Sequence, residues 1–330
     1  MKRYLGLLTA VALAFGATAA WAQKTVTFAY QDMMNPWRWV QQSGEVEKAT
    51  GFKINFRQFG GGGDVIRAMA SGDVQLGEIG STGIATAISQ GMDVELFWIL
   101  EDIAAAEALV ARNGSNINSI ADLKGKKIAT PFVSTSHFQL LYAMDKAGIK
   151  ASDAQILNMR PPEIAAAWGR GDIDATFIWD PVLSTVKKNG KVLMTSGDIC
   201  KQGACTFDGL VVTRKFAKEN PAFMVALVKA IAKADADYKA NAKGWSGDSD
   251  KAKAVAKWSG GKVEDVPEAM KLYGFPSLQE QASPSWLGDG AAAKALTQQA
   301  NFLKEQGRLT SVVPDYSKSV TTQWVTQAMK

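Results

Sequence analysis

One local pattern occurs twice in this chain, and it restricts the fold more than any other feature. Ala70-Ser71-Gly72-Asp73-Val74-Gln75 and Gly169-Arg170-Gly171-Asp172-Ile173-Asp174 each close an expected helix and open an expected strand. Glycine takes the left-handed conformation that ends helices, and aspartate satisfies the turn that follows. Because Gly72 and Gly171 are 99 residues apart, the pattern predicts two similar lobes; a chance match of a common Gly-Asp turn is the alternative.

Short apolar segments alternate with longer amphipathic ones in both halves of this region. The alternation is typical of an α/β fold whose mostly parallel sheets are flanked by helices. The expected strands are Thr25–Ala29, Lys53–Phe56, Val74–Ile79 and Val94–Ile99, then Lys127–Ala129, Gln155–Met159, Ala175–Trp179 and Val192–Met194. The expected helices are Trp37–Ala49, Asp64–Ala70 and Ile84–Gln90, then Phe138–Ala147, Ile164–Gly169 and Val182–Asn189. Ligands of such sheets bind at the carboxyl ends of strands.

After Asp208 the pattern becomes mainly helical. Leu210–Thr213 is one more expected strand, and Ala222–Ala240 and Ala291–Gln306 are expected helices that return to cover the first lobe. The chain then crosses between lobes at Glu107–Ala111 and Asp208–Thr213, which we expect to form a two-strand hinge. The predicted division is a signal peptide at 1–22, lobe 1 at 23–108 plus 210–330, and lobe 2 at 109–209.

The N-terminus has the parts of a secretory signal peptide. Lys2 and Arg3 precede the apolar run Leu5–Ala20, and Ala20-Trp21-Ala22 is a small-x-small cleavage pattern. The run is too short for a spanning helix, and no cysteine lies near the cut to carry a lipid. We expect cleavage after Ala22 and an exported protein; a buried N-terminal helix is the alternative.

The charge balance indicates neither a nucleic-acid nor a membrane partner. The chain has 37 basic and 32 acidic side chains, and 35 against 32 once Lys2 and Arg3 are removed. This excess is small and scattered, whereas nucleic-acid binding requires a clustered basic surface. No later segment is apolar for long enough to cross a bilayer.

Cysteine and histidine are scarce. Cys200 and Cys205 are the only cysteines, and close cysteines in an exported protein predict a disulfide that shapes the loop between them. A reactive or metal-binding pair is the alternative. His137 is the only histidine, which argues against a histidine-rich zinc site. We expect no metal and no cofactor.

Several strings together resemble one protein family. They are Phe28-Ala29-Tyr30-Gln31, Val65–Gln75, Glu107-Ala108-Leu109-Val110, Pro131–Phe138, Ala166–Asp174 and Phe302–Gly307. They resemble the taurine-binding proteins of ABC importers, within the wider family that binds sulfonates, nitrate and thiamine precursors. The resemblance implies a periplasmic binding protein fold (type II-like), a monomer that closes on its ligand and delivers it to a membrane permease.

Taurine carries a sulfonate and an ammonium, and a closed cleft must neutralise both. Helix N-termini favour anions, and Ser81-Thr82 and Ser134-Thr135-Ser136-His137 open two expected helices. We therefore predict that these residues bind the sulfonate. Ordinary helix capping is the alternative, because serine and threonine cap helices everywhere.

The ammonium requires a carboxylate. Asp208 matches the position that resembles the family's amine-binding acid, and Glu107 begins the other expected crossing strand. Asp180, in Trp179-Asp180-Pro181, departs from the taurine binders and is similar to broader sulfonate binders. The remaining predicted ligand-binding residues follow the first strand or precede Asp180: Gln31, Asp32 and Trp179. Exposed turns and strand ends are the alternative for the acids.

Two features favour a different ligand. Trp37 and Trp39 either form an aromatic face for a larger cation or pack a helix on the sheet. Gly60–Gly63 either lets the backbone approach an anion or forms a mobile loop. Another zwitterion, an amine or a thiamine-precursor-like solute is therefore the alternative ligand. An enzyme fits poorly, because one histidine and two disulfide-prone cysteines leave few catalytic groups.

Overall fold

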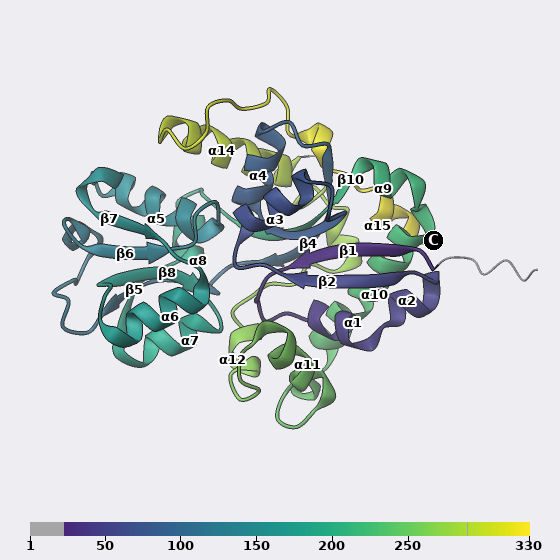
Figure 1. Ribbon diagram of the computed structural model, residues 1–330, viewed down its shortest axis with the longest axis horizontal. Coiled ribbons are helices and arrows are strands. Elements are labelled where there is room, and N and C mark those ends of the chain that lie inside the picture. The colour runs from purple at the N-terminus through teal and green to yellow at the C-terminus, as the bar shows by residue number, and fades with distance from the viewer. Residues whose placement is uncertain (1–22, 289) are drawn as a thin grey trace, which may run out of the picture.

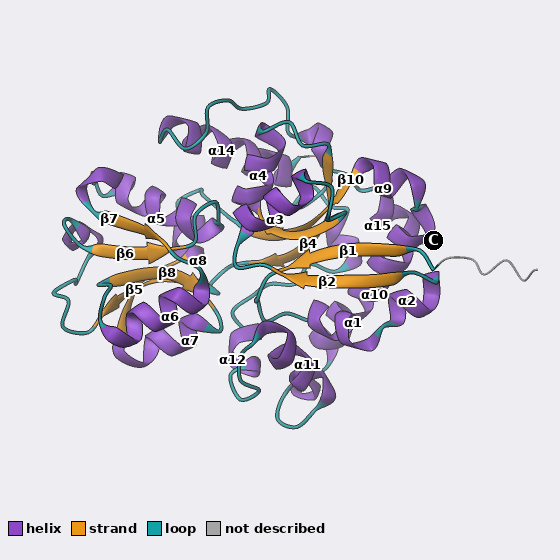
Figure 2. Cartoon of the chain, in the orientation of Figure 1, coloured by secondary structure: helices purple, strands orange, loops and turns teal. Residues whose placement is uncertain are grey.

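Two separate five-stranded sheets, each flanked by helices, form two lobes that lie side by side (Figures 1 and 2). The computed structural model describes residues 23–288 and 290–330. The predicted signal peptide, 1–22, lies outside the described residues. We call the first sheet with its helices lobe 1 and the second sheet with its helices lobe 2.

The sheet of lobe 1 has the strand order β2-β1-β3-β10-β4. Strand β1 pairs in parallel with β2 and β3, whereas β10 runs antiparallel to both of its neighbours. Four strands therefore point one way and one points back. The strands are β1 (Thr25–Tyr30), β2 (Lys53–Gln58), β3 (Leu76–Gly80), β4 (Val94–Asp102) and β10 (Phe207–Thr213).

Lobe 2 repeats this topology with the order β7-β6-β8-β5-β9, in which β5 is the reversed strand. Its strands are β5 (Glu107–Arg112), β6 (Lys127–Thr130), β7 (Gln155–Asn158), β8 (Ala175–Trp179) and β9 (Gly190–Thr195). Strands β3 and β8, which follow the two repeated turns of the sequence, occupy the same middle position in their sheets. The prediction of two similar lobes is confirmed.

The connections between the lobes are shorter than expected. Strand β5 pairs only with strands of lobe 2, and β10 pairs only with strands of lobe 1. Both edges of each strand are thus occupied within one sheet, and the crossings are the segments 103–106 and 201–206. The predicted disulfide Cys200–Cys205 closes the second crossing. The predicted boundaries at 108/109 and 209/210 fall inside β5 and β10 and stay a prediction.

The expected helices are present, with one of them divided in two, and α8 (Ser196–Cys200) is a further helix that the sequence does not predict. The expected helix Trp37–Ala49 is two helices, because Gly44 between them has a φ of 64°, which ends the first. The helices that flank the strands are α1 (Trp37–Ser43), α2 (Glu45–Thr50), α3 (Gly62–Ala70), α4 (Ser81–Ser89), α5 (Thr135–Lys146), α6 (Pro161–Arg170), α7 (Val182–Val186) and α8 (Ser196–Cys200).

The C-terminal part is helical and returns to lobe 1, as predicted. Its helices are α9 (Arg214–Glu219), α10 (Pro221–Ala240), α11 (Asp250–Ser259), α12 (Val266–Met270), α13 (Leu278–Gln281), α14 (Ala291–Glu305) and α15 (Gln323–Ala328). Helix α10 packs against α1 and α15, and α14 packs against α4. Within 23–288 and 290–330, no helix combines the length and apolar character that crossing a membrane requires.

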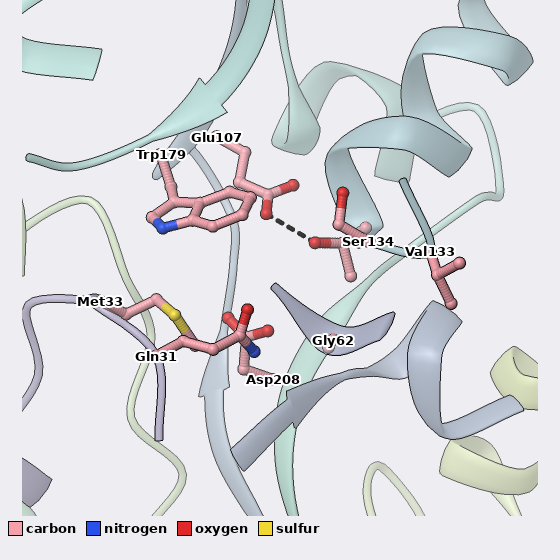
Figure 3. A pocket seen from close by; sticks show the side chains of 10 residues that line it. Gln31, Met33, Gly62, Glu107, Val133, Ser134, Trp179 and Asp208 are labelled. Carbon is pink, nitrogen blue, oxygen red and sulfur yellow. Dashed lines mark hydrogen bonds between the residues drawn. The ribbon is translucent and has the colours of Figure 1, made fainter. Parts of the chain in front are cut away.

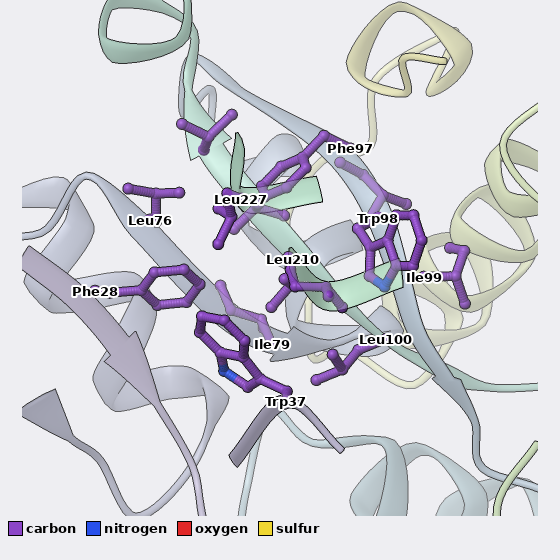
Figure 4. Packing of buried hydrophobic residues seen from close by; sticks show 14 of the residues in the cluster. Phe28, Trp37, Leu76, Ile79, Phe97, Trp98, Ile99, Leu100, Leu210 and Leu227 are labelled. Atoms are coloured by element: carbon purple, nitrogen blue, oxygen red, sulfur yellow. The ribbon is translucent and has the colours of Figure 1, made fainter. Parts of the chain in front are cut away.

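The largest core lies in lobe 1 (Figure 4). Trp37 is fully buried there, with its ring centroid 5.0 Å from that of Phe28 and 5.9 Å from that of Phe56. Burying one such side chain contributes roughly 1.5–3 kcal/mol or more. Trp39 packs partly buried against the same core. The two tryptophans therefore hold α1 on the sheet, and neither lines the cleft described below.

Candidate ligand-binding cleft

A small cavity lies between the two lobes. It contains about 260 Å³ of space that no atom fills, part of which is open to solvent. Each lobe supplies five of the lining residues: Gln31, Met33, Gly62, Gly80 and Asp208 from lobe 1, and Glu107, Val133, Ser134, Thr135 and Trp179 from lobe 2. The two sets face each other in Figure 3. A guest held here contacts both lobes and therefore favours their closed arrangement.

Three helices begin at this cavity. Gly62 begins α3, Gly80 directly precedes α4, and Ser134 caps α5 by accepting a 3.1 Å hydrogen bond from the backbone N–H of His137. The first N–H groups of a helix have no partner within it, and the helix dipole is positive at this end. These parts of the wall suit an anionic group.

The lobes approach closely at Val133. Its φ of 61° is a left-handed conformation that a β-branched residue rarely adopts, and such strain costs on the order of 1–3 kcal/mol. A Cβ atom on Gly62 would lie 3.0 Å from the Val133 carbonyl oxygen. Only glycine at position 62 therefore lets the start of α3 meet lobe 2 this closely.

Lobe 2 places one buried carboxyl in the cavity. Glu107 Oε1 accepts a 2.6 Å hydrogen bond from Thr135 Oγ1, and Oε2 accepts a 3.5 Å bond from Ser196. Burial raises the pKa of Glu107 to about 7, although these hydrogen bonds oppose the rise. Glu107 is therefore poised to change its charge near neutral pH.

Lobe 1 places more acids here than the sequence predicts. Asp208 lies directly opposite Glu101 in the antiparallel pair β10–β4, and Glu101 is fully buried. Burial is the first cause that raises the pKa of each, and the charge of the other acids adds to it. The Asn35 amide donates to both Glu101 oxygens, at 2.9 and 3.3 Å.

One buried cation accompanies these acids. Arg38 is fully buried and donates to both oxygens of Glu78, at 2.5 and 2.8 Å. It also donates to the Met33 carbonyl at 2.8 Å, which holds Met33 on the cavity wall. Gln31 is fixed by a 3.0 Å hydrogen bond from its amide to the Glu78 carbonyl. The two residues of the ion pair thus hold Met33 and Gln31 in place on the lobe 1 wall of the cavity.

Residues 48–243 match the protein family described as NMT1/THI5 like, over more than half of the chain. The chain belongs to the NMT1/THI5-like family. The taurine-binding periplasmic protein of Escherichia coli (strain K12) is 38% identical over 314 residues, which cover 95% of this chain and 96% of that relative.

Solved structures share the two-lobed fold of this NMT1/THI5-like protein. The periplasmic aliphatic sulphonate binding protein SsuA from Escherichia coli superposes with a TM-score of 0.71 at 23% identity, covering 93% of this chain and all of that one. The desulfurization enzyme DSZB superposes with a TM-score of 0.65 at 14% identity, covering 93% and 99%. At these identities the likeness shows the fold alone.

The structure brings half of the predicted site residues of this NMT1/THI5-like protein to the cavity: Gln31, Glu107, Ser134, Thr135, Trp179 and Asp208. The others do not line it: Asp32, Ser81, Thr82, Ser136, His137 and Asp180. Each of the latter has a different structural environment, as follows.

Ser81 and Thr82 face the C-terminal helices instead of the cavity. Their hydroxyls donate to Gln299 Oε1 of α14 at 3.0 and 2.7 Å. The Gln299 amide in turn donates to the Cys205 carbonyl at 3.2 Å. These residues therefore tie the start of α4 to the second crossing segment.

Asp32 lies at the mouth of the cleft and links the two lobes. Its Oδ1 accepts a 2.6 Å hydrogen bond from the Trp179 indole N–H, and burial raises its pKa to about 6. A second link across the mouth is the 3.0 Å ion pair between Arg160 and Asp64. Gly60 packs against the Arg160 side chain, so Gly60–Gly63 forms part of this closed mouth.

His137, Ser136 and Asp180 lie behind the wall. The His137 ring stacks on Phe132 with centroids 4.3 Å apart, and burial lowers its pKa to about 4, so the ring is neutral. Ser136 is fully buried. Asp180 Oδ1 accepts a 2.8 Å bond from the Ser184 N–H and so caps the start of α7.

A chain of buried side chains joins the cavity to the second crossing segment. Ser196 contacts Glu107 and also donates to Gln139 Oε1, and the Gln139 amide donates to Thr206 Oγ1 at 2.6 Å. Thr206 lies in the second crossing segment. These hydrogen bonds therefore connect Glu107 to the segment that links the two lobes.

The sequence contains a signal for the acids that we did not predict. Glu78 stands in the middle of the strand Leu76–Gly80, and Glu101 directly follows the apolar run Leu96–Leu100 of the strand Val94–Asp102. A charged residue within a buried strand requires a partner or a ligand. Arg38 has the same signal, because it stands between Trp37 and Trp39 in the sequence.

Acidification should stabilise the ligand-free protein between about pH 8 and pH 5. The raised pKa values of Glu107 (about 7) and Asp32 (about 6) mean that their protonated forms favour the folded state. This stability is complete below the unfolded pKa values near 4 and is lost as the pH rises through 6 to 7. Glu107 alone accounts for roughly 3 kcal/mol. Thermal melts at intervals of half a pH unit measure the trend.

Asp235 provides a test of the same effect away from the cleft. It is 1% exposed in α10, neither oxygen has a hydrogen-bond partner among the described residues, and burial raises its pKa well above the usual range. Asp235→Asn should therefore melt at a higher temperature than the wild type at pH 8, with a smaller difference at pH 5. A wild-type melting temperature that rises from pH 5 to pH 8 would contradict the prediction.

Proposed function

We propose that this chain is the periplasmic substrate-binding component of an ABC importer, and that its ligand is taurine or a closely related small sulfonate. The observation that carries the proposal is the composition of one closed cavity. Helix N-termini and buried carboxyls lie on its wall together. Such a wall complements a guest that carries both an anionic and a cationic group.

The size of the cavity limits the guest. Only ten residues, from two lobes in contact, line this space, which therefore suits a compact molecule and no long chain. Met33 and Trp179, both 3% exposed, supply the apolar part of the wall. A two-carbon spacer between sulfonate and ammonium fits this short apolar section.

The relatives support the same function. The 38% identical protein from Escherichia coli is named for taurine binding, and the match runs over nearly the whole length of both chains. The predicted signal peptide agrees with a periplasmic location, and an importer implies a membrane permease as the partner. We propose that the protein acts as a monomer and releases its ligand by opening its lobes.

We further propose that the protein binds its ligand without chemical change. Both cysteines of the chain form the disulfide, so neither is a free nucleophile. The only histidine is neutral and packed on Phe132 behind the wall. General acid–base catalysis needs a group within hydrogen-bonding reach of the guest, and His137 does not line the cavity.

Isothermal titration calorimetry of the mature protein tests the proposal. Taurine should bind saturably with one site, and Asp208→Asn should weaken it at least tenfold, because the ammonium loses a buried carboxylate. Asp73→Asn, in an exposed turn of the same lobe, should bind like the wild type. Unchanged affinity in Asp208→Asn would remove Asp208 from the site, and no binding of any small sulfonate would refute the function.

The surplus of carboxyls favours a second candidate ligand class. Glu107 and Asp208 line the cavity, and Glu101 pairs with Asp208 behind its wall. Glu78 is the one of these buried acids that pairs with a cation among the described residues, and that cation is Arg38. A cationic amine without a sulfonate would also satisfy this charge. A thermal-shift screen of sulfonates, amino acids and quaternary amines distinguishes the classes, because at one fixed concentration a ligand that binds more tightly raises the melting temperature further.

A further inference from the structure

The acids of lobe 1 carry more negative charge than a single ammonium requires. Glu78, Glu101 and Asp208 lie on the adjacent strands β3, β4 and β10. Arg38 uses both terminal nitrogens on Glu78. Among the described residues, no lysine or arginine pairs with Glu101 or Asp208. One acid of the three is therefore neutralised by a cation and two are not.

The two remaining acids face each other. Asp208 and Glu101 are direct cross-strand partners, and they are 4% and 0% exposed. Directly opposite residues of an antiparallel pair have neighbouring side chains on the same face of the sheet. Two like charges buried side by side disfavour each other's ionisation, so such a pair retains one proton that belongs to both acids.

A second observation points to the same place. The Tyr273 hydroxyl is buried without a partner among the described residues, and Glu101 and Asp208 are the first charges that act on it. A buried hydroxyl without a partner is costly. A polar group of the ligand beside the acid pair would give this hydroxyl a hydrogen-bond partner.

We propose that Asp208 and Glu101 share one proton in the ligand-free protein, and that the ammonium of the ligand takes the place of this proton. This inference rests on the proposed function and names the mechanism at its amine end. The proton leaves to the solvent as the ammonium enters, so the net charge at the acid pair itself is unchanged, and the helix N-termini must compensate the charge of the sulfonate. The exchange thereby avoids burying a second unpaired negative charge at the pair in either state.

The charged and titratable groups that face the pair come from several elements. The acids Glu78 of β3 and Glu107 of β5 favour retention of the proton, whereas Arg38 of α1 opposes it. The neutral groups are Asn35, which donates to Glu101, and Tyr273. The acids outnumber the cation, so the pair keeps its proton near neutral pH.

The proposal predicts that protons compete with amine ligands. Below the pH at which the pair releases its proton, the affinity for taurine should fall about tenfold per pH unit, since one proton is exchanged for one ligand. Ethanesulfonate lacks the ammonium and should expel no proton. Its affinity, though weaker, should not fall as the pH is lowered.

Calorimetry in buffers of different ionisation enthalpy counts the protons. The mature protein is titrated with taurine at pH 7 in phosphate and in Tris, and the difference in heat gives the number released. We expect about one proton for the wild type and for Glu268→Gln, an exposed acid paired with Lys271. Glu101→Gln removes the shared-proton partner and should bind taurine with a release near zero.

The possible results distinguish a failure of the shared-proton mechanism from a failure of the proposed function. Taurine binding with equal heats in both buffers would overturn the shared proton and leave the proposed function intact. Absence of taurine binding in every buffer would overturn both. If Glu101→Gln does not fold, the wild-type pH dependence from 5.5 to 8 decides alone, and an affinity for taurine that is constant over this range refutes the exchange.

Discussion

Gly80→Val should reduce ligand binding by more than a hundredfold without unfolding either lobe. A Cβ atom at position 80 would lie 2.9 Å from Thr135 Cγ2 and 3.1 Å from Asp208 Oδ1. The first atom belongs to the opposite lobe, so the added side chain keeps the lobes apart. The backbone of Gly80 is extended, with φ −63° and ψ 150°, which valine adopts readily. The loss therefore arises from blocked closure.

Calorimetry with taurine measures the loss in Gly80→Val, and small-angle scattering measures whether the lobes close when taurine is added. The melting temperature of the ligand-free variant should stay close to that of the wild type. Gly169→Val is the matched control, because nothing lies within 4 Å of a Cβ there and the residue is exposed on α6. Affinity within tenfold of the wild type in Gly80→Val would contradict the closed geometry.

Arg38→Met should destabilise the protein by roughly 3–5 kcal/mol, because it leaves Glu78 as an unpaired buried charge. Both side chains are 0% exposed. Arg38 also lowers the pKa of the neighbouring acids Glu101 and Asp208. Its loss therefore leaves the buried acids of lobe 1 without the positive charge that compensates them. Urea denaturation of the ligand-free protein measures the change in free energy of unfolding.

Two further variants separate the ion pair from other effects of the substitution. Arg38→Met combined with Glu78→Gln removes both charges and should recover a large part of the lost stability. Arg170→Met breaks an exposed pair with Asp172, and exposed pairs contribute under about 1 kcal/mol. Equal stability of Arg38→Met and Arg170→Met would show that the buried pair is not required for folding.

Most secondary structure follows from local pattern, and the exceptions have local causes. The break at Gly44 is not predicted, because the apolar periodicity of this tryptophan-rich segment alone does not show that Gly44 takes a left-handed conformation. The reversed strands β5 and β10 are not visible in the sequence, because strand direction depends on pairing with residues far away. Their predicted role as crossing strands differs from the structure for the same reason.

The site shows the same division between local and distant information. Asp208 and Glu107 begin strands at the lobe crossings, so their place at the cavity could be predicted from chain order. The environment of Ser81 and Thr82 could not be predicted, because their hydroxyls donate hydrogen bonds to Gln299, more than 200 residues later in the chain. Glu101 could not be predicted, because buried strands are usually apolar and its place beside Asp208 depends on pairing with a strand more than 100 residues later.

The place of β10 in the first sheet determines the order in which the protein can be assembled. Strand β4 has β10 as its only partner strand in that sheet. During synthesis β4 therefore has no partner strand until the chain has been made as far as residue 213. The second sheet uses only residues 107–195, one continuous stretch. A chain that emerges N-terminus first can therefore complete its second lobe before its first, with β4 exposed to other chains in the interval.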